Sequence, residues 1–200
     1  MPRMMTLLAV AICLPLFAAD GPSGQDSQST PKAALTYFLQ VGTDPNVDRP
    51  TTFYYAVTAE QKKVAVAFAS VDFATAKLRK IAKARWDAKA GDAVVHALRD
   101  ITEDDINNAD EAIDGDKATI TGKGFDSPLP MQKTDGKWRI SIPAVLEETK
   151  ATPDDLISAC TDLVDIIERT QEEIEADKYA NPSLLERAIK RRVKAILGDR

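Results

Sequence analysis

Two stretches of the sequence decide the expected fold: AIDGDKATI at residues 112–120 and KTDGKWRISI at residues 133–142. Apolar and polar side chains alternate in both, which is the period of a β-strand with one buried face. Each stretch also contains an Asp-Gly pair, which favours the tight turn of a β-hairpin. We therefore predict a meander of about four antiparallel strands across residues 106–143. Pro128 and Pro130 predict that the third strand lies at a sheet edge or is bulged.

Helical patterns precede the meander. Thr30-Pro31 combines a capping hydroxyl with a proline at the first helical position and predicts a first helix. Thr58 and Gln61 have the spacing of a capping box. From there to Trp86 apolar residues recur every three or four positions, which predicts one long helix or two abutting helices. For residues 43–57 we predict an irregular loop that holds a cluster of aromatic residues.

The last fifty residues predict a helical hairpin over residues 151–198. Residues 151–180 carry nine acidic and two basic side chains, whereas residues 181–200 carry two acidic and six basic ones. Amphipathic helices of opposite charge joined by an Asn-Pro turn are typical of an antiparallel pair. The expected fold class is α+β, with N-terminal helices packed on the meander and followed by this hairpin. We expect residues 30–143 to form an α+β domain that folds without the tail.

The N-terminus predicts export. Arg3 is the only charge in residues 1–19, and it is followed by an apolar run that ends in small residues. This run is too short to span a bilayer and is typical of a signal peptide cleaved after Ala18 or Ala19. Residues 20–29 predict a flexible linker. The expected location is periplasmic or extracellular, with no stable transmembrane segment after processing.

The remaining chain has a mildly acidic balance. Without residues 1–19 it holds 25 basic and 31 acidic side chains, a formal charge of −6. This charge gives no general attraction to nucleic acid or to anionic lipid. Cys160 would then be the only cysteine, so no intramolecular disulfide is expected. The common nucleotide-binding, zinc and hydrolase motifs are absent from the sequence, so we predict no cofactor.

Four features have a chemical interpretation and a structural one, and we favour the structural one for each. His96, the single histidine, suits a half-buried position on an amphipathic helix. Cys160 falls on an apolar helix stripe, where a thiol usually behaves as a small hydrophobe. The acidic run at 103–105 lacks the spacing of a calcium loop. The basic segment at 77–89 suits a solvated helix face that meets acidic neighbours in the same protein. We predict no catalytic residue and no metal site.

The helices, the meander segment at 112–120, the Pro-Leu-Pro region and the segment at 133–140 together resemble exported bacterial domains of the nuclear-transport-factor-2-like superfamily. The resemblance covers residues 30–143 and implies a cone-shaped α+β fold. Members range from isomerases and dehydratases to non-catalytic partner-binding domains, so the resemblance does not choose a function. No residue of this chain matches the catalytic carboxylates or histidines of the enzymes in that superfamily. The resemblance therefore assigns no catalytic role to any residue here.

Two functions from different classes remain. The first is an exported, non-catalytic binding or interaction module for an unknown protein or small molecule, whose C-terminal hairpin docks a partner or a second copy. The second is a small-molecule enzyme or carrier that uses the cone cavity. A buried carboxylate facing a cavity would favour the second, and an interior filled by apolar side chains would favour the first. Aromatic residues suit the rim of such a cone, so the candidate ligand-binding residues are Tyr54, Tyr55, Phe68, Trp86 and Trp138.

Overall fold

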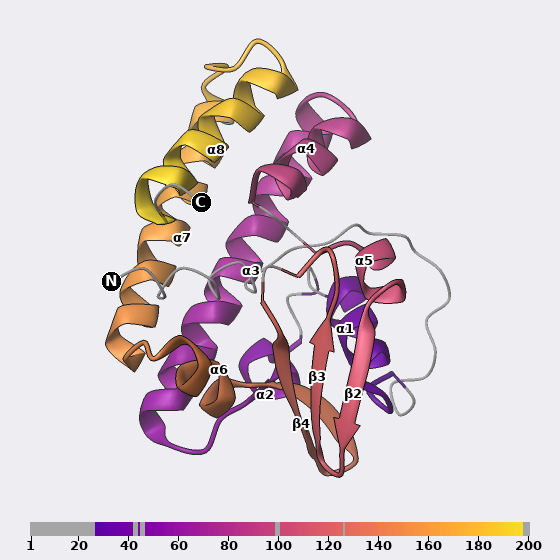
Figure 1. Cartoon of the computed structure of the whole chain (residues 1–200). Coiled ribbons are helices and arrows are strands. Elements are labelled where there is room, and N and C mark those ends of the chain that lie inside the picture. Colours follow the sequence, from indigo (N-terminus) through magenta and orange to yellow (C-terminus); the bar gives the residue numbers. More distant parts are fainter. Residues whose placement is uncertain (1–26, 42–43, 45–46, 99–100, 126, 198–200) are drawn as a thin grey trace.

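The structure is a computed structural model that describes residues 27–41, 44, 47–98, 101–125 and 127–197. The predicted leader, residues 1–19, and most of the predicted linker lie outside the described residues. In the described part, helices surround one face of a sheet and extend beyond it as a helical region (Figure 1). The helices are α1 (Pro31–Val41), α2 (Arg49–Phe53), α3 (Ala59–Arg85), α4 (Ala88–Leu98), α5 (Glu103–Asn107), α6 (Ile142–Thr149), α7 (Pro153–Glu175) and α8 (Pro182–Leu197), and the strands are β1 (Tyr54–Tyr55), β2 (Asp110–Asp114), β3 (Lys117–Thr121), β4 (Leu129–Thr134) and β5 (Lys137–Ser141).

The α+β class and the antiparallel meander are confirmed, with one strand more than predicted. The sheet order is β1-β5-β4-β3-β2, and β2 to β5 form the four predicted antiparallel strands. The fifth strand, β1, pairs in parallel with β5 and places Tyr54 beside Ile140. It lies in the segment 43–57 that was predicted as an irregular loop and that also forms α2. This prediction was wrong for residues 49–55, because burial against β5 orders an aromatic segment with no periodicity of its own.

Both Asp-Gly pairs form the predicted turns. Gly115 has a φ of 58° and begins the two-residue turn between β2 and β3. Asp135 and Gly136, with φ of 54° and 75°, form the turn between β4 and β5. In the β4–β5 turn, positive φ at both central positions matches the right-handed twist of the flanking strands, and in the β2–β3 turn Gly115 alone has a positive φ.

The prediction of an edge or bulged third strand was wrong for β4 as a whole. This strand lies inside the sheet, between β3 and β5. Pro130 pairs with Thr119 of β3, and the pairing with β5 begins one residue later, at Met131. The sheet therefore admits the proline because β4 has a single strand partner at that position.

The end of the predicted linker packs against the sheet. Ser27 and Gln28 are buried, at 5% and 3% exposure. The Gln28 side chain donates hydrogen bonds to the carbonyl oxygens of Thr52 (3.0 Å) and Trp138 (3.3 Å). In return the Trp138 N–H donates to the Gln28 carbonyl oxygen at 3.1 Å. The chain is thus held to β5 and α2 before α1 begins.

One long helix, α3, connects the α+β part to the helical part (Figure 1). Its start is the predicted capping box, in which Thr58 accepts from the Gln61 N–H and the Gln61 side chain accepts from the Thr58 N–H. It continues without a break to Arg85, so of the two predicted alternatives, one long helix or two abutting helices, the structure has the single helix. It packs against α2 and α6, and most extensively against α7 and α4.

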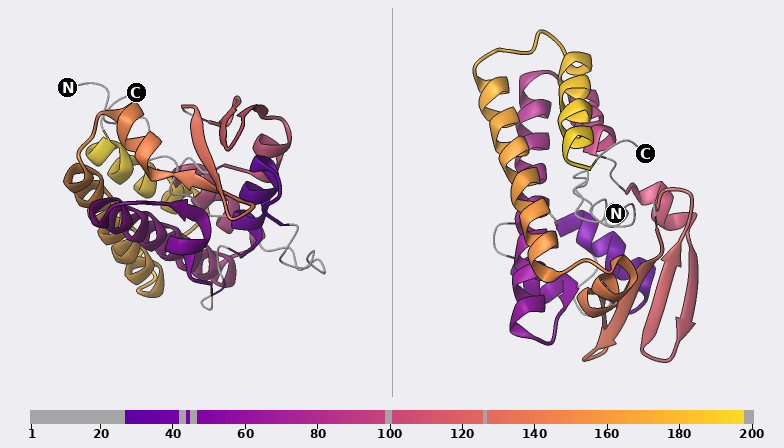
Figure 2. Two further views of the ribbon diagram at one scale, coloured as in Figure 1. Left: turned by 90° about the horizontal axis from the view of Figure 1, so that it is seen from below. Right: turned by 60° about the vertical axis from the view of Figure 1, so that its left-hand side comes forward.

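The C-terminal helices pack on the rest of the chain more than on each other. In both views α7 lies beside α3 over much of its length, and α8 lies beside α4 (Figures 1 and 2). The Gln171 side chain of α7 donates to the Ala74 carbonyl oxygen at 2.9 Å, and Asp177 pairs with Arg85. The stripe of α7 that faces inward is Leu156, Cys160, Leu163, Ile167 and Ile174, each at most 5% exposed.

A charged cluster joins α7 to α8. Glu173 has a side chain that is 9% exposed, and it pairs with Arg192 at 2.8 Å while accepting a hydrogen bond from the Tyr179 hydroxyl. Arg192 also donates to the Thr170 hydroxyl at 2.9 Å. Burial raises the pKa of Glu173, but the hydrogen bonds from Tyr179 and Arg192, together with the charges of Arg192 and Lys178, outweigh burial and leave this pKa below the usual value.

This cluster predicts a pH-dependent stability. A carboxyl group with a lowered pKa in the folded state stabilises the fold above its unfolded pKa, and this contribution is lost as the pH falls through the folded pKa. Glu173→Gln should lower the free energy of unfolding by about 1.5–3 kcal/mol at neutral pH. The difference from the unchanged protein should shrink well below pH 4.5, the usual glutamate pKa. Urea unfolding at both pH values measures it, and an equal difference at both would contradict the assignment.

Candidate functional site

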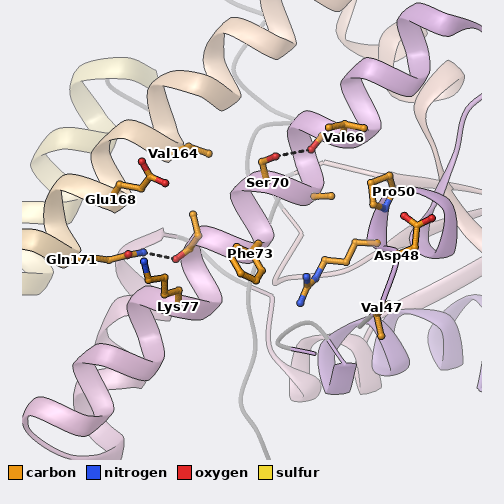
Figure 3. A pocket seen from close by; sticks show the side chains of 13 residues that line it. Val47, Asp48, Pro50, Val66, Ser70, Phe73, Lys77, Val164, Glu168 and Gln171 are labelled. Carbon is orange, nitrogen blue, oxygen red and sulfur yellow. Dashed lines mark hydrogen bonds between the residues drawn. The ribbon is translucent and has the colours of Figure 1, made fainter. Parts of the chain in front are cut away.

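An open groove runs along the outer face of α3, between α7 and the segment that leads into α2 (Figure 3). We call it the α3 groove. Its volume is about 490 Å³. The residues that line it are Val47, Asp48, Arg49, Pro50, Val66, Ala69, Ser70, Phe73, Ala74, Lys77, Val164, Glu168 and Gln171.

The floor of the groove exposes large apolar side chains. Val66 is 52% exposed and Phe73 is 47% exposed, although both lie in the middle of a helix whose other face is fully buried. Seven positions separate them, so they lie on the same side of α3, with Ser70 between them. The Ser70 hydroxyl donates to the Val66 carbonyl oxygen at 2.9 Å and is thereby engaged with its own helix.

The two walls supply polar groups. On one side the Arg49 guanidinium lies 5.4 Å from the centre of the Phe73 ring, a cation–π distance that covers part of the floor. Beside it Asp48 accepts a hydrogen bond from the Thr51 hydroxyl at 2.8 Å. On the other side Val164 and Glu168 of α7 border the floor (Figure 3).

Two side chains of opposite charge in the groove are available to bind a ligand. Lys77 and Glu168 both line it, yet neither takes part in the ion pairs formed within the described residues. An apolar floor beside an unpaired cation and an unpaired anion suits an amphipathic segment better than a purely apolar molecule.

Three of the predicted ligand-binding residues are buried in the core. Tyr54, Phe68 and Trp138 are 3%, 0% and 3% exposed. The rings of Tyr54 and Phe68 lie 5.8 Å apart, centre to centre. Trp138 lies on β5, the strand next to β1, where Lys133 approaches its ring at 5.8 Å.

The other two predicted residues lie elsewhere. Tyr55 is half-buried on the opposite face of β1 from Tyr54. Trp86 is half-buried at the C-terminal end of α3, about 27 Å along the helix from Phe68 at 1.5 Å per residue. The structure therefore does not bring the five aromatic residues together, and none of them lines the α3 groove.

A buried polar contact holds Tyr54 in place. Its hydroxyl donates to the Asp72 carboxylate at 2.8 Å, and Asp72 is 1% exposed. The charge of this carboxylate also acts on the thiol of Cys160 on α7. Burial, with a further contribution from Asp72, raises the pKa of the Cys160 thiol to about 12. Cys160 is therefore a protonated thiol at neutral pH, which agrees with its interpretation as a small core residue.

Among the described residues, only a small cavity lies between α1 and the sheet. This cavity has a volume of about 10 Å³, close to the minimum for one water molecule. Its lining is wholly aliphatic or aromatic: Leu35, Phe38, Leu39, Ile101, Ile106, Leu129 and Ile140. No buried carboxylate is part of this lining.

The acidic run at 103–105 begins α5. Thr102 and Asp105 form a reciprocal capping box, with Asp105 accepting from the Thr102 N–H at 2.9 Å. Three acidic side chains in the first turn also interact favourably with the helix dipole. Within the ranges that the structure describes, no group of three or more histidine, cysteine, aspartate or glutamate residues is placed to hold a metal ion.

The sequence did contain a signal for the groove that our reasoning missed. Val66 and Phe73 are out of phase with the buried stripe of α3 and fall on its polar side, seven residues apart. Lys62, Lys63 and Lys77 share that side. Two large apolar residues among lysines on a solvent-facing helix surface could have been noted as a candidate binding surface.

Comparison of the chain with protein-family models, with curated proteins and with solved structures finds no match. The resemblance to the nuclear-transport-factor-2-like superfamily accordingly stays a prediction. Among the helices that the structure describes, none combines the length and apolar character that crossing a membrane requires.

Proposed function

We propose that the protein is an exported, non-catalytic binding module whose binding surface is the α3 groove. The observation that carries this proposal is the exposure of Val66 and Phe73, 52% and 47%, on the floor of a 490 Å³ groove. Exposed apolar residues that are gathered in a groove and rimmed by polar groups mark interaction surfaces.

The filled interior supports a binding surface on the outside of the protein. If the chain has the cone that its resemblance implies, the space between α1 and the sheet is the cone interior. A cavity of about 10 Å³ lined by apolar side chains leaves no room there for a substrate. This arrangement favours the interaction module over the enzyme or carrier that would use the cone.

The export part of the proposal rests on the apolar N-terminal stretch and the small residues that end it. The intact mass of the protein recovered outside the cytoplasm tests this part. A mass that corresponds to a chain beginning at Ala19 or Asp20 supports this part of the proposal. A mass that corresponds to a chain retaining Met1 contradicts it.

An apolar dye tests the binding surface. Anilinonaphthalene sulfonate becomes fluorescent on apolar surfaces, and we expect one site at the groove. Phe73→Asp should weaken its binding by about tenfold, equivalent to about 1.4 kcal/mol, because it places a charge on the floor. Its matched control is Ile113→Asp, since Ile113 of β2 is 54% exposed and lies outside the groove. Unchanged thermal unfolding shows that both variants stay folded.

Two outcomes would overturn the proposal. In the first, Phe73→Asp binds the dye as tightly as the unchanged protein does. In the second, Phe38→Trp abolishes dye binding, because Phe38 lines the interior and not the groove. The second outcome would return the binding site to the cone.

A further inference from the structure

We infer that the occupant of the α3 groove is helix α7 of a second copy of this chain, so that two copies form a symmetric dimer. This inference rests on the proposed function and names its partner. Its basis is the side-by-side arrangement of a groove and a ridge of opposite charge on one face of the molecule.

The groove lies on a basic helix face. Lys62 and Lys63 precede its apolar floor, and Lys77 and Lys80 follow it, and all four lysine side chains are exposed. Positions 66, 70, 73, 77 and 80 repeat at intervals of four and three, so they form one continuous stripe along α3. Lys62 and Lys63 lie one turn before Val66, so positive charges flank the apolar floor at both of its ends.

The ridge beside the groove is acidic. We use the name α7 ridge for the exposed residues Asp162, Asp165, Glu168, Glu172 and Glu175. Arg169 is the single basic side chain between Asp162 and Glu175. Glu168 forms part of the groove wall, so the ridge continues the same molecular face (Figure 3). The half-buried Val164 gives the ridge an apolar contact as well.

The direction of the two helices makes this face self-complementary. Helices α3 and α7 run side by side in the same direction, since Gln171 bonds to Ala74, and Asp177, just after the end of α7, pairs with Arg85 at the end of α3 (Figures 1 and 2). A two-fold axis parallel to the helices and between them places each α7 over the α3 of the other copy. Each ridge then enters the other copy's groove, which is the isologous geometry of a closed dimer.

Charges match in that arrangement. Gln171 bonds to Ala74, so Glu168, three residues before Gln171, and Lys77, three residues after Ala74, lie on either side of that contact in the same groove. The two-fold axis brings Glu168 of the second copy within reach of the long Lys77 side chain, and the reverse pair forms by symmetry. Lys80 and Glu172, one turn farther on, oppose each other in the same way. Phe73 would lie against the apolar side of the ridge near Val164.

Sedimentation velocity of the processed protein over a range of concentrations tests the dimer. We expect Lys77→Glu and Glu168→Lys each to weaken dimerisation by at least about tenfold, because each places like charges opposite each other at two symmetric contacts. The double variant Lys77→Glu/Glu168→Lys restores both pairs and should dimerise within about threefold of the unchanged protein. Lys123→Glu is the matched control, because Lys123 is exposed and lies outside the groove and the ridge.

Each result decides between the inference and its alternatives. Restoration in the double variant together with an unaffected Lys123→Glu supports the dimer. A protein that stays monomeric at every concentration overturns it, as does a dimer that neither single variant weakens. A double variant as weak as the single variants also overturns it. If the dimer fails while dye binding still depends on Phe73, the proposed function stands and the groove has a different occupant.

Discussion

A chain that ends at Lys150 should show no cooperative thermal unfolding, contrary to the sequence-based expectation that residues 30–143 fold without the tail. Removal of α7 would uncover the face of α3 against which this helix packs. On that face Gln171 bonds to Ala74, and Cys160 interacts with the charge of Asp72. Burial of each large apolar side chain of α7 contributes about 1.5–3 kcal/mol. Four such residues together match much of the 5–15 kcal/mol by which a typical domain is stable. Circular dichroism during heating measures the loss, and a sharp transition in the shortened chain would contradict this prediction.

Point variants keep this prediction testable if the shortened chain is insoluble. Leu163 is 5% exposed, and its neighbour Val164 is half-buried at the groove. Leu163→Ala should lower the free energy of unfolding by about 2–5 kcal/mol, as truncation of a core leucine typically does. Val164→Ala, the matched control on the same helix, should cost less than about 1 kcal/mol. If both variants lowered the free energy of unfolding equally, Leu163 would not be the residue through which α7 packs on the core.

Replacing Tyr54 should be the most damaging change among the aromatic residues of the sheet edge. Tyr54→Ala removes a ring that is 3% exposed and packs against Phe68 at 5.8 Å, so we expect a loss of about 3–5 kcal/mol. Tyr54→Phe keeps the ring but withdraws the hydroxyl that donates to Asp72. This variant should cost about 1–3 kcal/mol, because a buried carboxylate loses a hydrogen bond.

Tyr55→Ala is the control for Tyr54. Its side chain is half-buried on the other face of β1, so its loss should cost less than about 1 kcal/mol. Urea unfolding of the three variants measures the differences. Nearly unchanged stability of Tyr54→Ala would contradict the core assignment and would restore Tyr54 as a candidate for ligand binding.

Local patterns predicted most of the elements because their causes are local. The two Asp-Gly turns depend on backbone angles that aspartate and glycine adopt readily, and the start of α3 depends on the reciprocal bonds of Thr58 and Gln61. The alternation around Trp138 and Ile140 placed one face of β5 in the core for the same reason, since side chains of a strand point to opposite faces in turn.

The candidate site was predicted poorly because exposure is a property of packing. Aromatic residues with polar tips suited a binding rim, yet Tyr54 and Phe68 became core residues where β1 joined the sheet. The groove floor shows the opposite error. Phe73 looks like one more apolar residue of a helix in the sequence, and it stays exposed because neither α7 nor the segment before α2 covers that side of α3.

Sequence patterns were sufficient to predict the α+β class, the meander with its two turns and the helical character of the C-terminal residues. Capping, periodicity and turn formation involve residues within a few positions of one another. Three features depend on tertiary packing: α7 packs along α3, β1 completes the sheet, and Val66 and Phe73 face an open groove. These features join residues up to 97 positions apart, and an amphipathic stripe indicates that a helix face is buried without indicating which surface buries it.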